Sequence, residues 1–294
     1  MVAEFPPYDS KRFSNVYGHP AKAVYEDLRT LGPSFSALEA LASSQNFLDW
    51  LGQISGIKRL LYDPFCFGGG AQENRPGMHL FPHVDFNCHP FEPWHRRINM
   101  LLYLNPGWDA RWGGCLQLYD ETPRGVSALK TILPEFNRCV IFATSEKSWH
   151  GVTPVAMPPA DFSRKSVSFY FYTRKKPGLS PHSTLWRFPA LPARIKSGRR
   201  LDAADIEDVN RALFYRDSEI DHLSMRGFHL QWKSPLSADW RPGHVLGPRE
   251  SAWLKRQIRR KDAWLRILWH GRARGGIQEA VERRKCEPLP PAGA

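Results

Sequence analysis

The sequence contains no long run of apolar residues. No segment approaches the roughly 20 consecutive apolar residues that a transmembrane helix needs, so we expect no membrane span. The first residues, MVAEFPPYDSKRF, also lack the apolar centre of a secretory signal. We therefore expect the mature protein to begin at or near Met1.

Cysteine is scarce, with five residues, an odd number, and no C-x-x-C pair. This pattern argues against both a disulfide framework and a zinc cluster. A reducing compartment fits best, and we expect the protein to be cytoplasmic. Cys115 and Cys139 lie in apolar runs, where a cysteine behaves as a small buried hydrophobic residue.

Acidic residues are in deficit, with 29 Asp and Glu against 41 Lys and Arg and a formal net charge of +12. Much of the excess lies between Arg249 and Arg274, where only Glu250 and Asp262 are acidic. Clusters of this kind attract acidic partners, so this segment could bind nucleic acid or another anionic polymer. Docking of an amphipathic helix onto the core or a second subunit is the simpler interpretation, and we favour it.

Changes in residue composition and in hydrophobic spacing divide the chain into four predicted regions. Residues 1–57 form a helical segment packed on the core, because residues 20–56 carry apolar residues at helical spacing, interrupted at Gly32-Pro33, which predicts two helices. Residues 58–176 form the core. Residues 177–200 are a proline-rich linker, and residues 201–294 are a basic helical extension with a disordered tail.

The core region consists of short runs rich in β-branched and aromatic residues, separated by turn residues. The clearest predicted strands are INMLLYLN, GCLQLYD, CVIFAT and KSVSFYFYT. Strands without helices between them favour a double-stranded β-helix, or jelly roll. The predicted fold class is therefore mainly β with flanking helices (α+β). Two helices, LDAADIEDVNRALFYR and PRESAWLKRQIRRKDAWLRILWHG, form the C-terminal appendage, and Pro248 suits a first helical position.

Three residues have the chemistry of an iron site. His83 and Asp85 are two positions apart in FPHVDFN, so a strand would point both side chains to one face. His150 follows the strand CVIFAT, and a jelly roll can return it beside that pair. Two imidazoles and one carboxylate on one face of an octahedral ion form the facial triad of non-haem iron(II) oxygenases. The open positions can take a bidentate 2-oxo acid and dioxygen.

A strand beyond His150 begins with Arg164 and would place Arg164, Ser166, Ser168 and Tyr170 on one face. A guanidinium at the head of an inward-facing row can grip the far carboxylate of 2-oxoglutarate. Lys165 is the alternative cation, but strand alternation places it on the opposite face.

The elements HVD, LLYLNPGWDARWGG, WHG and R-x-S follow one another in an order that resembles the iron(II)/2-oxoglutarate oxygenases of the prolyl-hydroxylase-like superfamily, over roughly residues 60–176. The resemblance implies that His83, Asp85 and His150 bind Fe(II) and that Arg164 and Tyr103 bind the 5-carboxylate of 2-oxoglutarate. Ser166 and Asn99 are further candidates for the cofactor pocket. Dioxygen would be the co-substrate and ascorbate an accessory reductant.

The activity implied by this resemblance is hydroxylation of an unactivated C–H bond, coupled to decarboxylation of 2-oxoglutarate to succinate and CO2. The intact Asp85 favours hydroxylation over halogenation, since related halogenases have a small residue there. The expected substrate is a prolyl or other peptidyl residue. The alternatives are a free amino acid, a natural-product intermediate or a saccharide. From a different class, a non-catalytic metal-containing jelly-roll binding protein or a nucleic-acid-associated module remains open.

Other residues near the motifs are weaker candidates. The glycine-rich segment Gly68–Gly77 is predicted to be a mobile lid that presents Gln72 and Glu73 to substrate. The remaining residues that flank the triad are expected to be ordinary structural or surface residues: Asn87, Trp149, Arg97, His79, His89 and His95.

Overall fold

The structure is a computed structural model in which residues 1–10, 12–16, 19–122, 125–156, 162–175, 179–224 and 240–269 are described. The chain divides into two compact units, Met1–Ala190 and Leu191–Ala294. No helix among the described residues is long and apolar enough to cross a membrane. The tail EPLPPAGA and Cys286 lie outside the described residues.

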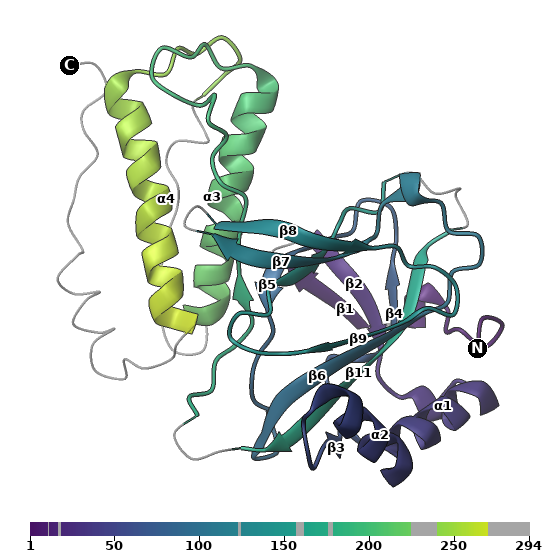
Figure 1. Cartoon of the computed structure of the whole chain (residues 1–294). Coiled ribbons are helices and arrows are strands. Elements are labelled where there is room, and N and C mark those ends of the chain that lie inside the picture. Colours follow the sequence, from purple (N-terminus) through teal and green to yellow (C-terminus); the bar gives the residue numbers. More distant parts are fainter. Residues whose placement is uncertain are drawn as a thin grey trace. The chain divides into compact units, whose positions relative to one another are not determined.

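The first unit contains two antiparallel sheets (Figure 1). The large sheet has the order β1-β2-β4-β11-β6-β9, and β3 also pairs with β11. Its strands are β1 (Arg12–Val16), β2 (His19–Tyr25), β3 (Leu61–Tyr62), β4 (Gly70–Asn74), β6 (Trp94–Tyr103), β9 (Cys139–Ala143) and β11 (Arg164–Arg174). The small sheet has the order β12-β5-β10-β7-β8. Its strands are β5 (Leu80–Val84), β7 (Leu116–Thr122), β8 (Gly125–Ile132), β10 (His150–Val152) and β12 (Leu185–Trp186).

These two sheets form the double-stranded β-helix predicted from the strand pattern. The four clearest predicted strands correspond to β6, β7, β9 and β11, so each of these predictions is confirmed. Short 3-10 turns, η1 (Tyr8–Ser10), η2 (Leu28–Thr30) and η3 (Ala110–Trp112), lie between elements.

Helices α1 (Pro33–Ser43) and α2 (Gln45–Ser55) cover one face of the large sheet. On β11 the alternate residues Val167, Phe169 and Phe171 are buried in this apolar cluster, and the Phe47 and Phe171 ring centroids lie 6.0 Å apart. The intervening residues of β11 must therefore point to the other face, toward the small sheet. One strand thus stabilises the core with one face and supplies polar side chains to the interior with the other.

The prediction of two helices within residues 20–56 is partly wrong. The segment before Gly32-Pro33 enters β2, which pairs with β4, and the two helices both follow Gly32 and are separated at Ser44. The Ser44 side chain accepts a hydrogen bond from the Phe47 backbone N–H and so begins α2. Pairing with β4 here overrides the local helical periodicity.

The prediction of a lid at Gly68–Gly77 is also wrong. Residues Gly70–Asn74 form β4, which is buried throughout and hydrogen-bonded to β2 and β11. Gly70 has φ +86°, and a Cβ there would lie 2.2 Å from the Tyr25 carbonyl oxygen. The glycine is therefore needed for close strand packing and not for hinge motion.

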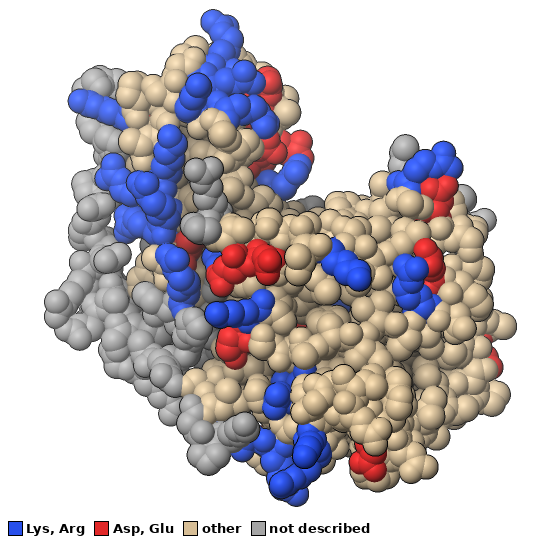
Figure 2. All heavy atoms as spheres, in the orientation of Figure 1, with Lys and Arg blue, Asp and Glu red and all other residues tan. Residues whose placement is uncertain are grey.

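The expected linker contributes a strand, because β12 pairs with β5 in the small sheet. The second unit contains the two predicted helices, α3 (Ala203–Ser224) and α4 (Pro248–Trp269), which lie side by side (Figure 1). Val209, Leu213 and Leu254 belong to an apolar cluster of this unit. Lys and Arg side chains gather over α4 (Figure 2).

Candidate active site

The structure brings His83, Asp85 and His150 together between the two sheets. Antiparallel pairing of β5 with β10 places His83 directly opposite His150, and their ring centroids lie 4.3 Å apart. The ligand atoms of all three residues lie within 4.8 Å of one another. The Asp85 carboxylate is 3.6 Å from His83 Nε2 and 3.3 Å from His150 Nε2. This arrangement is a preformed three-ligand metal site.

Both histidines are oriented by their backbone neighbours. The Nδ1 atoms lie 2.8 Å from the Phe81 carbonyl oxygen in His83 and 2.9 Å from the Ser148 carbonyl oxygen in His150. If each Nδ1–H donates to that carbonyl, each Nε2 keeps its lone pair for a metal. Burial, followed by the neighbouring His150, lowers the pKa of His83. A neutral imidazole is the form that coordinates iron.

Asp85 is fixed by two side chains from β6. Arg96 Nη2 lies 2.9 Å from Asp85 Oδ2, and the Asn99 amide donates a 2.8 Å hydrogen bond to the same oxygen. Arg96 Nε in turn donates to Asn99 Oδ1 at 3.0 Å. Burial by itself would raise the pKa of Asp85, but Arg96 and the two imidazoles hold it well below its ordinary value. Asp85 is therefore a carboxylate at neutral pH and leaves its other oxygen to the metal.

Sequence reasoning missed Arg96 and considered Arg97 instead. Alternate residues of a regular strand point to the same side, so Arg97, two residues before Asn99, is expected on the inner face. The pairing of β6 with β11 shifts register there, so that Ile98 pairs with Phe171 while Arg96 pairs with Tyr172. This bulge turns Arg96 inward, where its guanidinium lies 3.4 Å from the centre of the Tyr170 ring.

Replacing Asn99 by alanine is expected to lower iron affinity by about 10- to 100-fold, the range typical of partners that orient metal ligands. Asn105→Ala is the matched control, because Asn105 is also a buried amide but bonds to the backbone of Pro134 and Lys165, away from the triad. Anaerobic Fe(II) titration measures the effect. Equal loss of affinity in both variants would mean that Asn99 acts through folding alone.

The inner face of the large sheet also carries the predicted 2-oxoglutarate residues. Arg164 is 1 % exposed and donates to the Gly114 carbonyl oxygen at 2.7 Å, to Asn74 Oδ1 at 2.8 Å and to the Tyr103 hydroxyl at 3.3 Å. Tyr103 and Asn99 lie on the same face of β6, so Arg164 and the Asn99 side chain that bonds Asp85 share the inner face of the large sheet. Asn74 was missed because its segment was predicted to be a loop.

This pocket has the donors that a carboxylate needs. Each terminal nitrogen of Arg164 carries a second N–H, and the Tyr103 hydroxyl, which accepts from Arg164, keeps its own proton. Burial raises the pKa of Tyr103 against the opposing effect of Arg164, so the phenol stays protonated. The buried hydroxyl of Ser166 has no hydrogen-bond partner among the described residues. A dicarboxylic cofactor fits this donor set.

Except for Ser168, the remaining candidates have structural partners. Lys165 Nζ is 2.8 Å from the Ser163 hydroxyl, on the face opposite Arg164. Ser168 Oγ is buried, faces inward and has no partner among the described residues. Others are occupied elsewhere: Asn87 bonds to Ser180 and His182, Gln72 to Gly68, Glu73 to Ser163, and His89 to Asp63.

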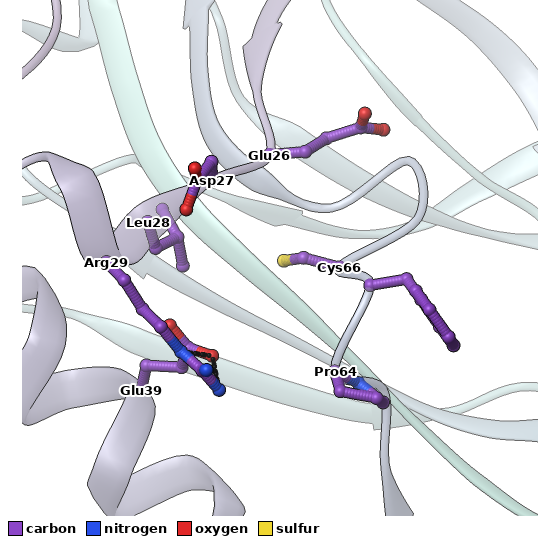
Figure 3. Close-up of a pocket in the computed structure, with 8 residues that line it drawn as sticks. Glu26, Asp27, Leu28, Arg29, Glu39, Pro64 and Cys66 are labelled. Carbon is purple, nitrogen blue, oxygen red and sulfur yellow. Dashed lines mark hydrogen bonds and ion pairs between the residues drawn. The ribbon is translucent and has the colours of Figure 1, made fainter.

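A separate cavity lies on the helix-covered side of the large sheet (Figure 3). Its lining consists of Glu26, Asp27, Leu28, Arg29, Glu39, Pro64, Phe65 and Cys66. Arg29 Nε donates to the buried Glu39 carboxylate at 2.9 Å, and Leu28 and Cys66 belong to the helix-side core. None of these residues belongs to the triad or the arginine pocket, so we assign this cavity no part in the reaction.

Residues 70–172 match the family described as the 2OG-Fe(II) oxygenase superfamily. Prolyl 3-hydroxylase OGFOD1 of Mus musculus is 33% identical over 132 residues, which are 40% of this chain and 23% of the relative. The Xenopus laevis protein of the same name is 36% identical over 87 residues, 29% of this chain and 17% of the relative. The chain thus spans less than a quarter of these relatives. A prolyl 4-hydroxylase structure from Phytophthora capsici is 17% identical, with a TM-score of 0.41 over 94% of this chain and 78% of the other.

Proposed function

Because residues 70–172 belong to the 2OG-Fe(II) oxygenase superfamily, we propose that this iron(II)- and 2-oxoglutarate-dependent enzyme hydroxylates an unactivated C–H bond of a peptidyl residue, with proline the favoured residue. The balanced reaction consumes 2-oxoglutarate, dioxygen and the substrate C–H group, and releases succinate, CO2 and the hydroxylated product. Ascorbate is the proposed accessory reductant.

The observation that carries this proposal is a three-ligand site whose Asp85 bonds to Asn99, on the same inner face of the large sheet as the buried Arg164. These three residues would hold a bound iron ion and leave its other coordination positions for the cofactor and dioxygen. Arg164 and Tyr103 provide donors for the distal carboxylate. A purely structural metal site would be closed by a fourth protein ligand, and no fourth such residue joins the cluster within the described part of the chain.

Each residue of the site has a distinct proposed role. Bound iron would supply the oxidising chemistry. His83, His150 and Asp85 would hold it, while Arg96 and Asn99 keep Asp85 charged and oriented. Arg164 would bind the distal carboxylate of 2-oxoglutarate and so orient the 2-oxo group of the cofactor toward the iron ligands. Burial of Arg164, His83 and His150 limits the access of bulk water to the site.

A row of aromatic side chains beside His83 supports a substrate with an apolar ring. Trp186 of β12 pairs with His83, and their ring centroids lie 4.7 Å apart. Two residues further, Phe188 lies against Phe81 at 6.1 Å. These three aromatic residues are half-buried, whereas His83 is only 6 % exposed. The row therefore forms a partly solvent-reachable wall next to the iron ligands, suited to packing against a prolyl ring.

The names of the curated relatives favour proline, since both are called prolyl 3-hydroxylases. That property belongs to those proteins and supports this chain's substrate only as a proposal. Hydroxylation of a free amino acid, a natural-product intermediate or a saccharide is the alternative, because a ring in such a molecule would pack on the same aromatic side chains.

The test is to incubate the protein with Fe(II), ascorbate and 2-oxoglutarate in the presence of peptides, amino acids and glycans. The expected result is a gain of one oxygen in a proline-containing peptide, with succinate formed in equal amount. If only a small molecule gains oxygen, that molecule and not a peptide is the substrate. No succinate with or without any of these compounds would indicate a non-catalytic binding protein.

A further inference from the structure

The exposed charged residues of α4 are all basic. They are Arg249, Lys255, Arg256, Arg259 and Arg266. With 3.6 residues per turn, their positions fall within an arc of about 120° around the helix axis. These five residues, hereafter the α4 basic stripe, extend along the helix for about 25 Å at 1.5 Å per residue. Figure 2 shows the corresponding gathering of Lys and Arg over α4.

The two acidic residues of α4 are used elsewhere. Glu250 accepts a 2.8 Å hydrogen bond from the Gly247 backbone N–H at the start of the helix, and it lies 3.1 Å from His244 Nε2. Asp262 accepts a 2.7 Å hydrogen bond from Arg216 of α3, and neither acid is among the exposed residues. The acidic side chains of α4 therefore do not offset the charges of Lys255, Arg256, Arg259 and Arg266.

The apolar face of α4 is already occupied within its own unit. Leu254 and Ile258 are buried in the cluster that includes Val209 and Leu213 of α3. A helix that inserts into a membrane interface needs its apolar face free, and this one is engaged in the protein core. The sequence-based interpretation favoured docking of this face onto the core or a second subunit, whereas its described contacts are with α3 of the same unit; this packing leaves the basic face without a role.

We propose that the α4 basic stripe binds the phosphodiester backbone of a double-stranded nucleic acid. Its five charges are spread over about 25 Å of a rigid helix, a length over which duplex DNA presents about 15 phosphate charges at one per roughly 1.7 Å of axis. Four of the five residues are arginine, whose planar guanidinium bonds phosphate oxygens in pairs. No aromatic residue lies in the stripe, which disfavours single strands bound by base stacking. Contacts to phosphate alone make the binding independent of base sequence.

Fluorescence anisotropy of the full-length protein with labelled 20-base-pair DNA and RNA duplexes tests this proposal. Affinity should fall steeply with salt, with a slope of log K against log salt of about −4.5 for five phosphate contacts, because roughly 0.9 counterions are released per contact. Arg256→Glu/Arg259→Glu should weaken binding roughly tenfold or more at 100 mM salt. The two duplexes decide whether B-form or A-form geometry is preferred.

Lys130→Glu/Lys147→Glu is the matched control, since it makes the same change in net charge at exposed residues of the first unit. It should bind duplexes nearly as the wild type does. Equal weakening by both double variants, no binding at 50 mM salt, or tighter binding to phosphatidylserine vesicles than to duplexes would each overturn the proposal. Succinate formation should be unchanged in Arg256→Glu/Arg259→Glu, so this test is independent of the proposed oxygenase activity.

Discussion

Replacing Asp85 by alanine is expected to lower 2-oxoglutarate turnover by more than about 100-fold, beyond the 10- to 100-fold effect of residues that only orient metal ligands. Asp85 is the one carboxylate of the triad, so its loss removes both a ligand and the negative charge that faces Fe(II). Iron affinity and succinate formation, each measured on purified protein, should fall together.

Asp85→Ala also leaves Arg96 buried without its carboxylate, which can destabilise the fold by about 3–5 kcal/mol. Asp85→Asn keeps the shape of the side chain and separates the two effects. Asp120→Asn, at an exposed position of β7 in the same sheet, is the control and should behave as the wild type does. Folded Asp85→Asn that forms succinate at the wild-type rate would rule out the assigned iron site.

Replacing Arg164 by methionine is expected to raise the Kd for 2-oxoglutarate roughly 100-fold or more, while Fe(II) affinity changes little. Truncating one partner of a buried, hydrogen-bonded charge pair costs about 2–5 kcal/mol, and each 1.4 kcal/mol is a factor of about ten. Arg164→Lys keeps the charge but loses the paired geometry, so an intermediate Kd is expected.

Lys165→Met is the matched control for Arg164, because it removes the neighbouring cation on the opposite face of β11. Its Kd for 2-oxoglutarate should remain close to the wild-type value. The variants of Arg164 also need a thermal unfolding measurement, since this side chain bonds to Asn74, Gly114 and Tyr103. A larger increase in the Kd for 2-oxoglutarate in Lys165→Met than in Arg164→Met would assign the cofactor carboxylate to Lys165. Equal loss of affinity for Fe(II) and for 2-oxoglutarate in Arg164→Met would refute a specific role of Arg164 in cofactor binding.

The iron ligands could be predicted because their signal is local. His83 and Asp85 share a face through the two-residue period of a strand, and metal chemistry limits which side chains can complete the set. The strand at Arg164 and the helix that begins at Pro248 have equally strong local patterns, and the structure shows both where they were expected.

Several site residues could not be predicted, because they depend on pairing between distant segments. Arg96 faces Asp85 only because the register of β6 on β11 shifts beside it. Asn74 reaches Arg164 because a glycine-rich segment, which by itself suggests a loop, is held as a strand between β2 and β11. Trp186 meets His83 because a proline-rich segment returns to the edge of the small sheet.

The amino-acid sequence alone thus determined the metal ligands, the class of fold and the two C-terminal helices. The spacing of residues along the chain and the periodicity of hydrophobic residues extend over only a few positions, so both can be read from the sequence without coordinates. The tertiary structure alone decided which arginine holds Asp85, what supports Arg164 and which aromatic wall flanks the iron ligands. Those contacts depend on strand register across long stretches of chain, where a shift of one residue exchanges the inner and outer faces.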